Sequence, residues 1–241
     1  MVASALACAA AAYVLPAGSI LRRLVDARED LKLSTLRVDG ALSFFGDAAK
    51  EAGAAMAVPA DRSELQVDAA FLLKFPGRCR LEVTPIEGRA AASIVSGGKP
   101  RREGNPLPAA DVLVAQVCAI LGTASNPDAR AALEKHLGEL HVDLEAPTSL
   151  ARWGGEVAYV LGTSGPDEPQ LWVYKDSFLP ARLKFKDKEG VSWDVHFFDY
   201  ASPATGEWFP RMLELDRNGT LSLRFTALKG DVKAKLEDPL F

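Results

Sequence analysis

A closely spaced series of short apolar segments in the second half of the chain constrains the fold most. Six segments between residues 157 and 228 alternate apolar and polar side chains and follow one another at hairpin spacing. This is the pattern of strands whose side chains face opposite sides of a sheet in turn. Asn218-Gly219 separates the last two segments and is a strong hairpin signal. The series predicts an antiparallel sheet that is large enough to curl.

The first half of the chain predicts further strands. Its segments with alternating apolar residues are 36–46, 65–75, 78–86 and 89–98. Pro76-Gly77 marks a turn between two of them. Residues 47–64 are rich in Ala and Gly and predict a mobile connection, whereas the basic segment 99–108 predicts a solvated loop.

Three segments carry apolar residues at helical spacing. Residues 19–32 follow a potential cap at Ser19, residues 109–122 are almost wholly apolar, and residues 126–140 begin with Asn126 as a cap. The last two helices arrive together between strands, so we expect them to cover one face or opening of the sheet. The fold class predicted is mainly β, with helices added (α+β).

The first 18 residues differ in composition from the rest. They are small and apolar, which is typical of a secretory leader, and they are too few to span a bilayer. No Lys or Arg precedes Arg22, so our hypothesis is that the leader is truncated and its natural start lies further upstream. Lipidation of Cys8 is an alternative to simple cleavage. We expect residues 19–241 to form a single domain.

The two remaining cysteines, Cys79 and Cys118, lie in a strand pattern and in an apolar helix. We expect buried free thiols here, with a disulfide between them as the alternative that export would allow.

Candidate chemistry in the sequence is sparse. The chain has only three histidines: His136 and His141 lack metal-binding helical spacing, and His196 lies opposite an apolar strand face, so we expect it to face solvent. We therefore predict no metal, no cofactor and no enzymatic activity. The net charge of −4 argues against nucleic-acid binding.

Aromatic side chains fall on the apolar side of many different strands. They allow two interpretations, a filled core or a concave face around a cavity that suits acyl chains, and parity alone does not separate them.

Several phrases resemble the LolA/LolB-like family of bacterial lipoprotein-binding proteins. The segment AAFLLKFPGRCRLEV is similar to a strand-turn-strand of that family at Lys74, Pro76, Arg78 and Arg80. The segment QLWVYKDSFLPARLKF resembles its recurring hairpin, with matches at Trp172, Lys175, Asp176, Leu179 and Pro180. FFDY, WFPRMLEL and the terminal LEDPLF also fit, so the likeness covers roughly residues 19–241.

This resemblance implies a curved antiparallel half-barrel whose open side is covered by helices, with a helical lid near residues 109–140. Family members often carry an Arg before the turn proline that holds the lid closed, but this chain has Phe75 there. A lid held mainly by apolar contacts is the physical alternative.

The resemblance also implies a function and a site. We expect non-enzymatic binding and transfer of acylated ligands, lipoproteins or lipids, by a monomer in the periplasm or at the periplasmic face of the outer membrane. A membrane-bound donor or receptor protein would be its partner. An envelope stress sensor or adaptor of the RseB type is the alternative. The lid residues expected are Val112, Leu113, Val117 and Leu121. The cavity residues expected are Leu42, Phe44, Val67, Phe71, Leu73, Leu183, Phe185, Trp193, Val195, Phe197, Leu213, Leu223 and Phe225.

Overall fold

A computed structural model describes residues 14–59, 63–123 and 126–241. These residues form four α-helices, twelve strands and a short 3-10 helix. The helices are α1 (Ala17–Glu29), α2 (Gly46–Met56), α3 (Pro108–Leu121) and α4 (Ala129–Glu139), followed by η1 (Asp238–Leu240) at the end of the chain. The strands are β1 (Thr35–Phe45), β2 (Glu64–Lys74), β3 (Arg78–Thr84), β4 (Ala91–Ser96), β5 (Lys99–Glu103), β6 (Ser149–Trp153), β7 (Glu156–Leu161), β8 (Gln170–Tyr174), β9 (Pro180–Lys186), β10 (Ser192–Phe198), β11 (Met212–Arg217) and β12 (Thr220–Asp231).

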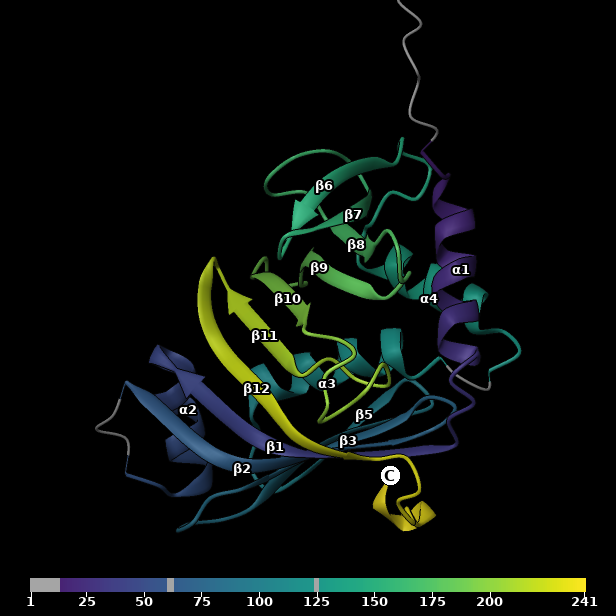
Figure 1. The fold of residues 1–241 in the computed structure, drawn as a ribbon. Helices are drawn as coiled ribbons and strands as arrows, with labels where there is room; N and C mark the ends of the chain where they lie inside the picture. The colour runs from purple at the N-terminus through teal and green to yellow at the C-terminus, as the bar shows by residue number, and fades with distance from the viewer. Residues whose placement is uncertain (1–13, 60–62, 124–125) are drawn as a thin grey trace, which may run out of the picture.

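All twelve strands belong to one sheet in the order β5-β4-β3-β2-β1-β12-β11-β10-β9-β8-β7-β6. Every pair of neighbouring strands is antiparallel, and the sheet remains open between β5 and β6. Figure 1 shows that the sheet curves strongly, with β1 to β5 forming its lower part and β6 to β9 its upper part. This confirms the predicted curved antiparallel sheet with added helices.

The bend of the sheet passes through the pairing of β1 with β12. A register shift lies between Asp39 and Gly40, and Gly40 approaches the opposite strand closely. A Cβ atom at Gly40 would lie 2.4 Å from the carbonyl oxygen of Thr226 and 2.7 Å from the ring of Phe225. Only glycine permits this approach, which lets two long strands cross the bend of the sheet.

The concave side of the sheet carries the main core. We call this side the inner face; it is the side on which Cys79 of β3 meets Cys118 of α3 through a disulfide. Helix α3 contacts β3, β4 and β12, and α4 contacts both α3 and α1. The opposite, outer face of β2 and β3 is partly covered by the C-terminal segment, where Lys74 and Arg78 pair with Asp238.

Several sequence predictions differ from the structure. Residues 47–64 do not form a mobile connection throughout, because α2 occupies their first part and packs its small residues on β1, β2 and β12. The basic segment after residue 98 is not only a loop, since Lys99–Glu103 pairs with β4 as an exposed edge strand. Helix α1 begins at Ala17 after Pro16 rather than at a Ser19 cap, and α4 begins at Ala129 rather than at Asn126.

The expectation of two buried free thiols was wrong. Cys79 and Cys118 form a disulfide with a Cα–Cα distance of 5.6 Å. Cys8 and most of the expected leader lie outside the described residues.

Candidate functional site

The inner face presents a continuous apolar layer across the sheet. Leu42 pairs with Val67 on one side and with Phe225 on the other; Phe225 pairs with Leu213, and Leu213 with Phe197. Strand alternation places all of these side chains on the same face. Each of the 13 residues expected to line a cavity is at most 6% exposed, and all belong to the same core cluster.

The inner face is filled by elements of the chain itself. Ile20, Leu21 and Leu24 of α1 are fully buried in the core, as are Leu113 and Val117 of α3. Leu121, also expected in the lid, is likewise buried, whereas Val112 is only partly buried. Three surface pockets among the described residues, of about 380, 690 and 750 Å³, contain no expected cavity or lid residue in their lining. The structure therefore shows a closed arrangement.

A loop between β10 and β11 places an aromatic side chain in the core, which the sequence analysis did not predict. Phe209 begins the fifth of the six apolar segments expected as strands, residues 209–216, but it lies in this loop, fully buried between two inner-face rings. Its ring centroid is 5.3 Å from that of Phe71 and 6.1 Å from that of Phe225. An intramolecular aromatic side chain thus occupies the centre of the apolar layer.

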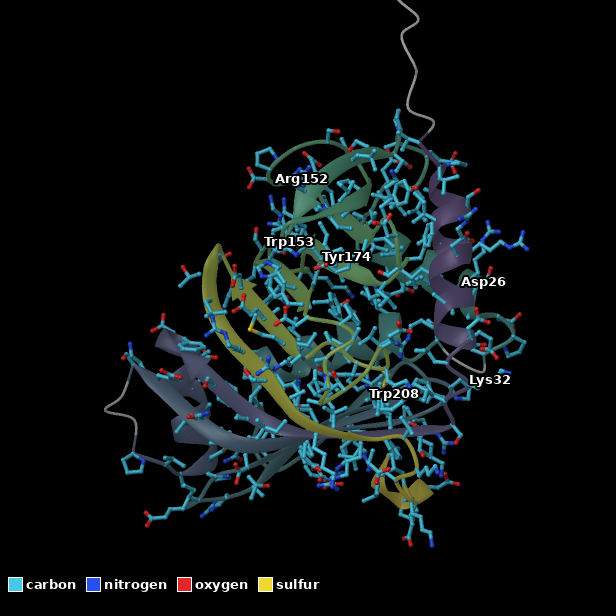
Figure 2. The ribbon with its side chains drawn as sticks, in the orientation of Figure 1. Asp26, Lys32, Arg152, Trp153, Tyr174 and Trp208 are labelled. Atoms are coloured by element: carbon cyan, nitrogen blue, oxygen red, sulfur yellow. A yellow bond between two sulfur atoms is a disulfide. The ribbon has the colours of Figure 1, made fainter. Side chains whose placement is uncertain are left out.

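Arg28 joins three of the elements that cover the inner face. It extends from α1 and donates through Nη1 to the carbonyl of Trp208 at 2.9 Å and through Nη2 to the carbonyl of Leu121 at 3.2 Å. Figure 2 labels Trp208 in the lower half of the molecule, on the inward side of the end of α1. Burial lowers the pKa of Arg28 to about 10. The sequence held a signal for this residue, since it falls on the helix face of the buried Leu21 and Leu24.

A groove of about 690 Å³ runs beside α3 and α4 at the rim of the sheet. Pro76, Val95 and Pro100 form its sheet side, and Cys118 and His136 are among the helix residues that line it. His136 Nε2 lies 2.8 Å from Oε1 of Gln116, a contact that joins the two helices. Burial lowers the pKa of His136.

The outer face carries a ladder of polar side chains across four strands. Arg182 of β9 binds Asp194 with its Nε 2.9 Å from Oδ1, and Arg224 of β12 binds Glu214 with its Nε 2.7 Å from Oε1. His196 lies between the two pairs. Its Nε2 is 3.0 Å from Asp194 Oδ1, but the two groups are not aligned for a hydrogen bond.

The expectation that His196 faces solvent was wrong, because it is only 7% exposed. Trp153 from the edge strand β6 covers it, with ring centroids 4.9 Å apart, and the same indole stacks on Arg182 at 4.4 Å. Figure 2 shows Trp153 and Tyr174 in this part of the sheet. Nothing in the sequence indicated that Trp153 of β6 would cover side chains of β9 and β10, which lie three and four strands away in the sheet.

The inner face offers an extended apolar contact surface. Among the described residues, no group of three His, Cys, Asp or Glu side chains is close enough to hold a metal ion. The inner face is apolar throughout the expected positions, so it provides contact area and no acid, base or nucleophile. No described helix combines the length and apolar composition that crossing a bilayer requires.

Comparison with known proteins identifies the fold. No family model and no curated protein matches the sequence. Among solved structures, a LolA superfamily protein from Nitrosomonas europaea is similar with a TM-score of 0.56 at 16% identity, covering 95% of this chain and 98% of that one. A DUF1329 family protein from Desulfovibrio piger is similar with a TM-score of 0.51 at 12% identity, with coverage of 95% and 98%. The open antiparallel sheet with its covering helices is therefore a LolA/LolB-like fold.

Proposed function

We propose that this protein binds the acyl chains of lipoproteins or lipids against its inner face and passes them on without chemical change. The observation that carries the proposal is the uninterrupted apolar layer contributed by strands from both halves of the sheet. Removing an acyl chain from water onto such a surface gains about 0.8 kcal/mol for each methylene group.

Binding would proceed by exchange of apolar contacts. The inner face is covered by α1, α3 and the Phe209 loop, so acyl chains must displace part of this cover. Both the cover and the ligand are apolar, which keeps the net free energy of exchange small, as release to a receptor or membrane requires. A membrane-bound donor or acceptor, a monomeric carrier and a place in the bacterial periplasm or at the periplasmic face of the outer membrane belong to the same proposal.

The first test is mass spectrometry of the protein isolated from its native envelope. We expect co-purified acyl species, and the same measurement gives the mature N-terminus and any lipid on Cys8. A protein partner retained without any lipid would instead favour an adaptor.

A pair of variants tests whether acyl chains bind at the inner face. Phe185 and Trp193 are cross-strand partners, and with Val67 they are the most exposed members of the expected cavity set, at 6%, 5% and 5%. We expect Phe185→Asn to weaken binding of a fluorescent fatty-acid probe, whereas Lys186→Asn, the exposed next residue on the other face, should bind as the wild type does. Equal probe affinity in both variants, with circular dichroism unchanged, would refute binding at this face.

A further inference from the structure

Helix α3 is attached to its surroundings at three places along its length. Near its start, Asp111 accepts hydrogen bonds from Ser93 Oγ of β4 at 2.7 Å and from Arg102 Nε of β5 at 2.6 Å. At its end, the Leu121 carbonyl accepts a hydrogen bond from Arg28. In its last turn, Cys118 is bonded to Cys79.

The three attachments differ in how readily they break. The Arg102 side chain in the ion pair with Asp111 is 50% exposed, so this pair contributes little to holding the helix. The bond from Arg28 to the Leu121 carbonyl is buried but non-covalent. The disulfide is covalent and breaks only by reduction. Moreover, Cys79 stands on the inner face near the start of β3, paired with Leu73 of β2 and Val95 of β4, so the bond fixes the last turn of α3 over this end of β3.

We propose that the Cys79–Cys118 disulfide is a redox lock on the inner face, and that its reduction by a dithiol frees α3 to make way for acyl chains. This inference rests on the proposed function, because it states when the apolar layer becomes available. Because the contact between Gln116 and His136 joins α3 to α4, displacement of α3 requires either that α4 moves with it or that this contact breaks.

The groove beside α3 gives a reductant access to one of the two sulfurs. Cys118 lines this groove and is 4% exposed, whereas Cys79 is completely buried beneath the helix. An incoming thiolate therefore meets Cys118 Sγ and expels Cys79 as the leaving group.

A dithiol supplies both of the electrons that reduction of the Cys79–Cys118 bond requires. Attack forms a mixed disulfide between the reductant and Cys118 and releases the Cys79 thiolate, which takes up a proton. The second thiol of the reductant then attacks the mixed disulfide and releases Cys118, which is also protonated. The protein gains two electrons and two protons, and the reductant leaves as a disulfide.

Binding of a fluorescent fatty-acid probe to the full chain tests the proposal. The oxidised protein, the protein reduced with dithiothreitol and the reoxidised protein are compared, with thiol alkylation and mass measurement confirming each state. We expect reduction to raise the apparent affinity about tenfold or more, because the population with α3 displaced increases, and reoxidation to reverse the gain. The double variant Cys79→Ser/Cys118→Ser should bind as the reduced protein does and ignore the reductant. Equal affinity in the oxidised and reduced states would overturn the lock.

Hydrogen exchange separates failure of the lock from failure of the proposed function. If no redox state binds the probe, acyl binding fails, and the lock is judged from exchange alone. Exchange that accelerates more in α3 than in β10 to β12 after reduction supports the lock. Unchanged exchange in α3 overturns it, and so does an equal acceleration in every element, since the disulfide would then only stabilise the whole fold.

Discussion

Nη2 of Arg28 lies 3.2 Å from the carbonyl oxygen of Leu121, which ties the end of α1 to the end of α3 through a buried cation. Arg28 is fully buried, and within the described part of the chain it makes no ion pair. Its Nε has no hydrogen-bond partner. Two carbonyl dipoles therefore compensate the charge, and burial lowers the pKa of the guanidinium to about 10.

This balance predicts that Arg28 contributes to the stability of the fold more through its volume than through its charge. Arg28→Ala should lower the free energy of unfolding by about 3 kcal/mol, because it leaves a cavity and two carbonyls without a donor. Arg28→Met fills most of the space and removes the cost of burying a charge, so we expect a loss of about 1 kcal/mol or less. Urea unfolding measures both, and an equal loss in the two variants would contradict this reasoning.

The disulfide should also stabilise the fold as a whole. It closes a loop with a sequence separation of 39 residues. The chain-entropy estimate for a loop of this length is about 4 kcal/mol. We expect Cys79→Ser/Cys118→Ser to lose about this amount in equilibrium denaturation relative to the oxidised wild type. The reduced wild type is the matched control, and a variant much less stable than it would mean that packing of the serines, not the missing bond, dominates.

Gly40 offers a test of how the sheet bends. Gly40→Ala would place its methyl group 2.4 Å from the Thr226 carbonyl oxygen and against the Phe225 ring, so either the bulge or the strand pairing must shift. We expect a loss of about 3 kcal/mol, in the range of overpacked cores.

Gly138→Ala is the control for this substitution. Gly138 lies in α4 with open space around its Cα, and alanine there should stabilise the protein by up to about 1 kcal/mol. Thermal unfolding compares the two glycine variants. A Gly40→Ala variant as stable as the wild type would show that the close approach is relaxed at little cost.

The side of the sheet that each strand residue faces followed from the sequence because it depends on local alternation. Leu183 and Phe185 lie on the expected face since a period of two leaves no other choice once one face is apolar. The features that were missed depend on contacts between distant segments. His196 is buried by Trp153, and the disulfide joins a strand to a helix 39 residues away.

Phe209 shows a different limit of prediction from the sequence. An apolar residue at the start of a predicted strand fits the strand pattern equally well when it lies in a loop that turns into the core, because alternation does not report where strand pairing stops. Arg28 shows that a charged residue on an apolar helix face was a usable signal. Burial of such a side chain requires acceptors, which only the folded neighbours supply.

Two facing carboxylates on the outer face have pKa values shifted in opposite directions, so their charges should affect the stability of the fold in opposite ways. Asp194 and Asp216 are cross-strand partners on β10 and β11. Burial alone would raise the pKa of Asp194, but the contacts with Arg182 and His196 outweigh it and lower that pKa. Burial raises the pKa of Asp216, with Asp194 and Glu214 adding to the shift and His196 opposing it.

The signs of these shifts set the prediction. A lowered pKa in the folded state means that the Asp194 charge stabilises the fold above the ordinary pKa of about 3.9 and that this contribution is lost as the pH falls through the folded-state value. Asp194→Asn should therefore lose about 2 kcal/mol at pH 7, and its deficit should shrink on acidification to about pH 3. The raised pKa of Asp216 means that its charge opposes folding at pH 7, so Asp216→Asn should gain stability there. Urea unfolding at the two pH values measures both variants. A deficit for Asp194→Asn that does not change with pH would show that the loss comes from altered packing and not from the missing charge.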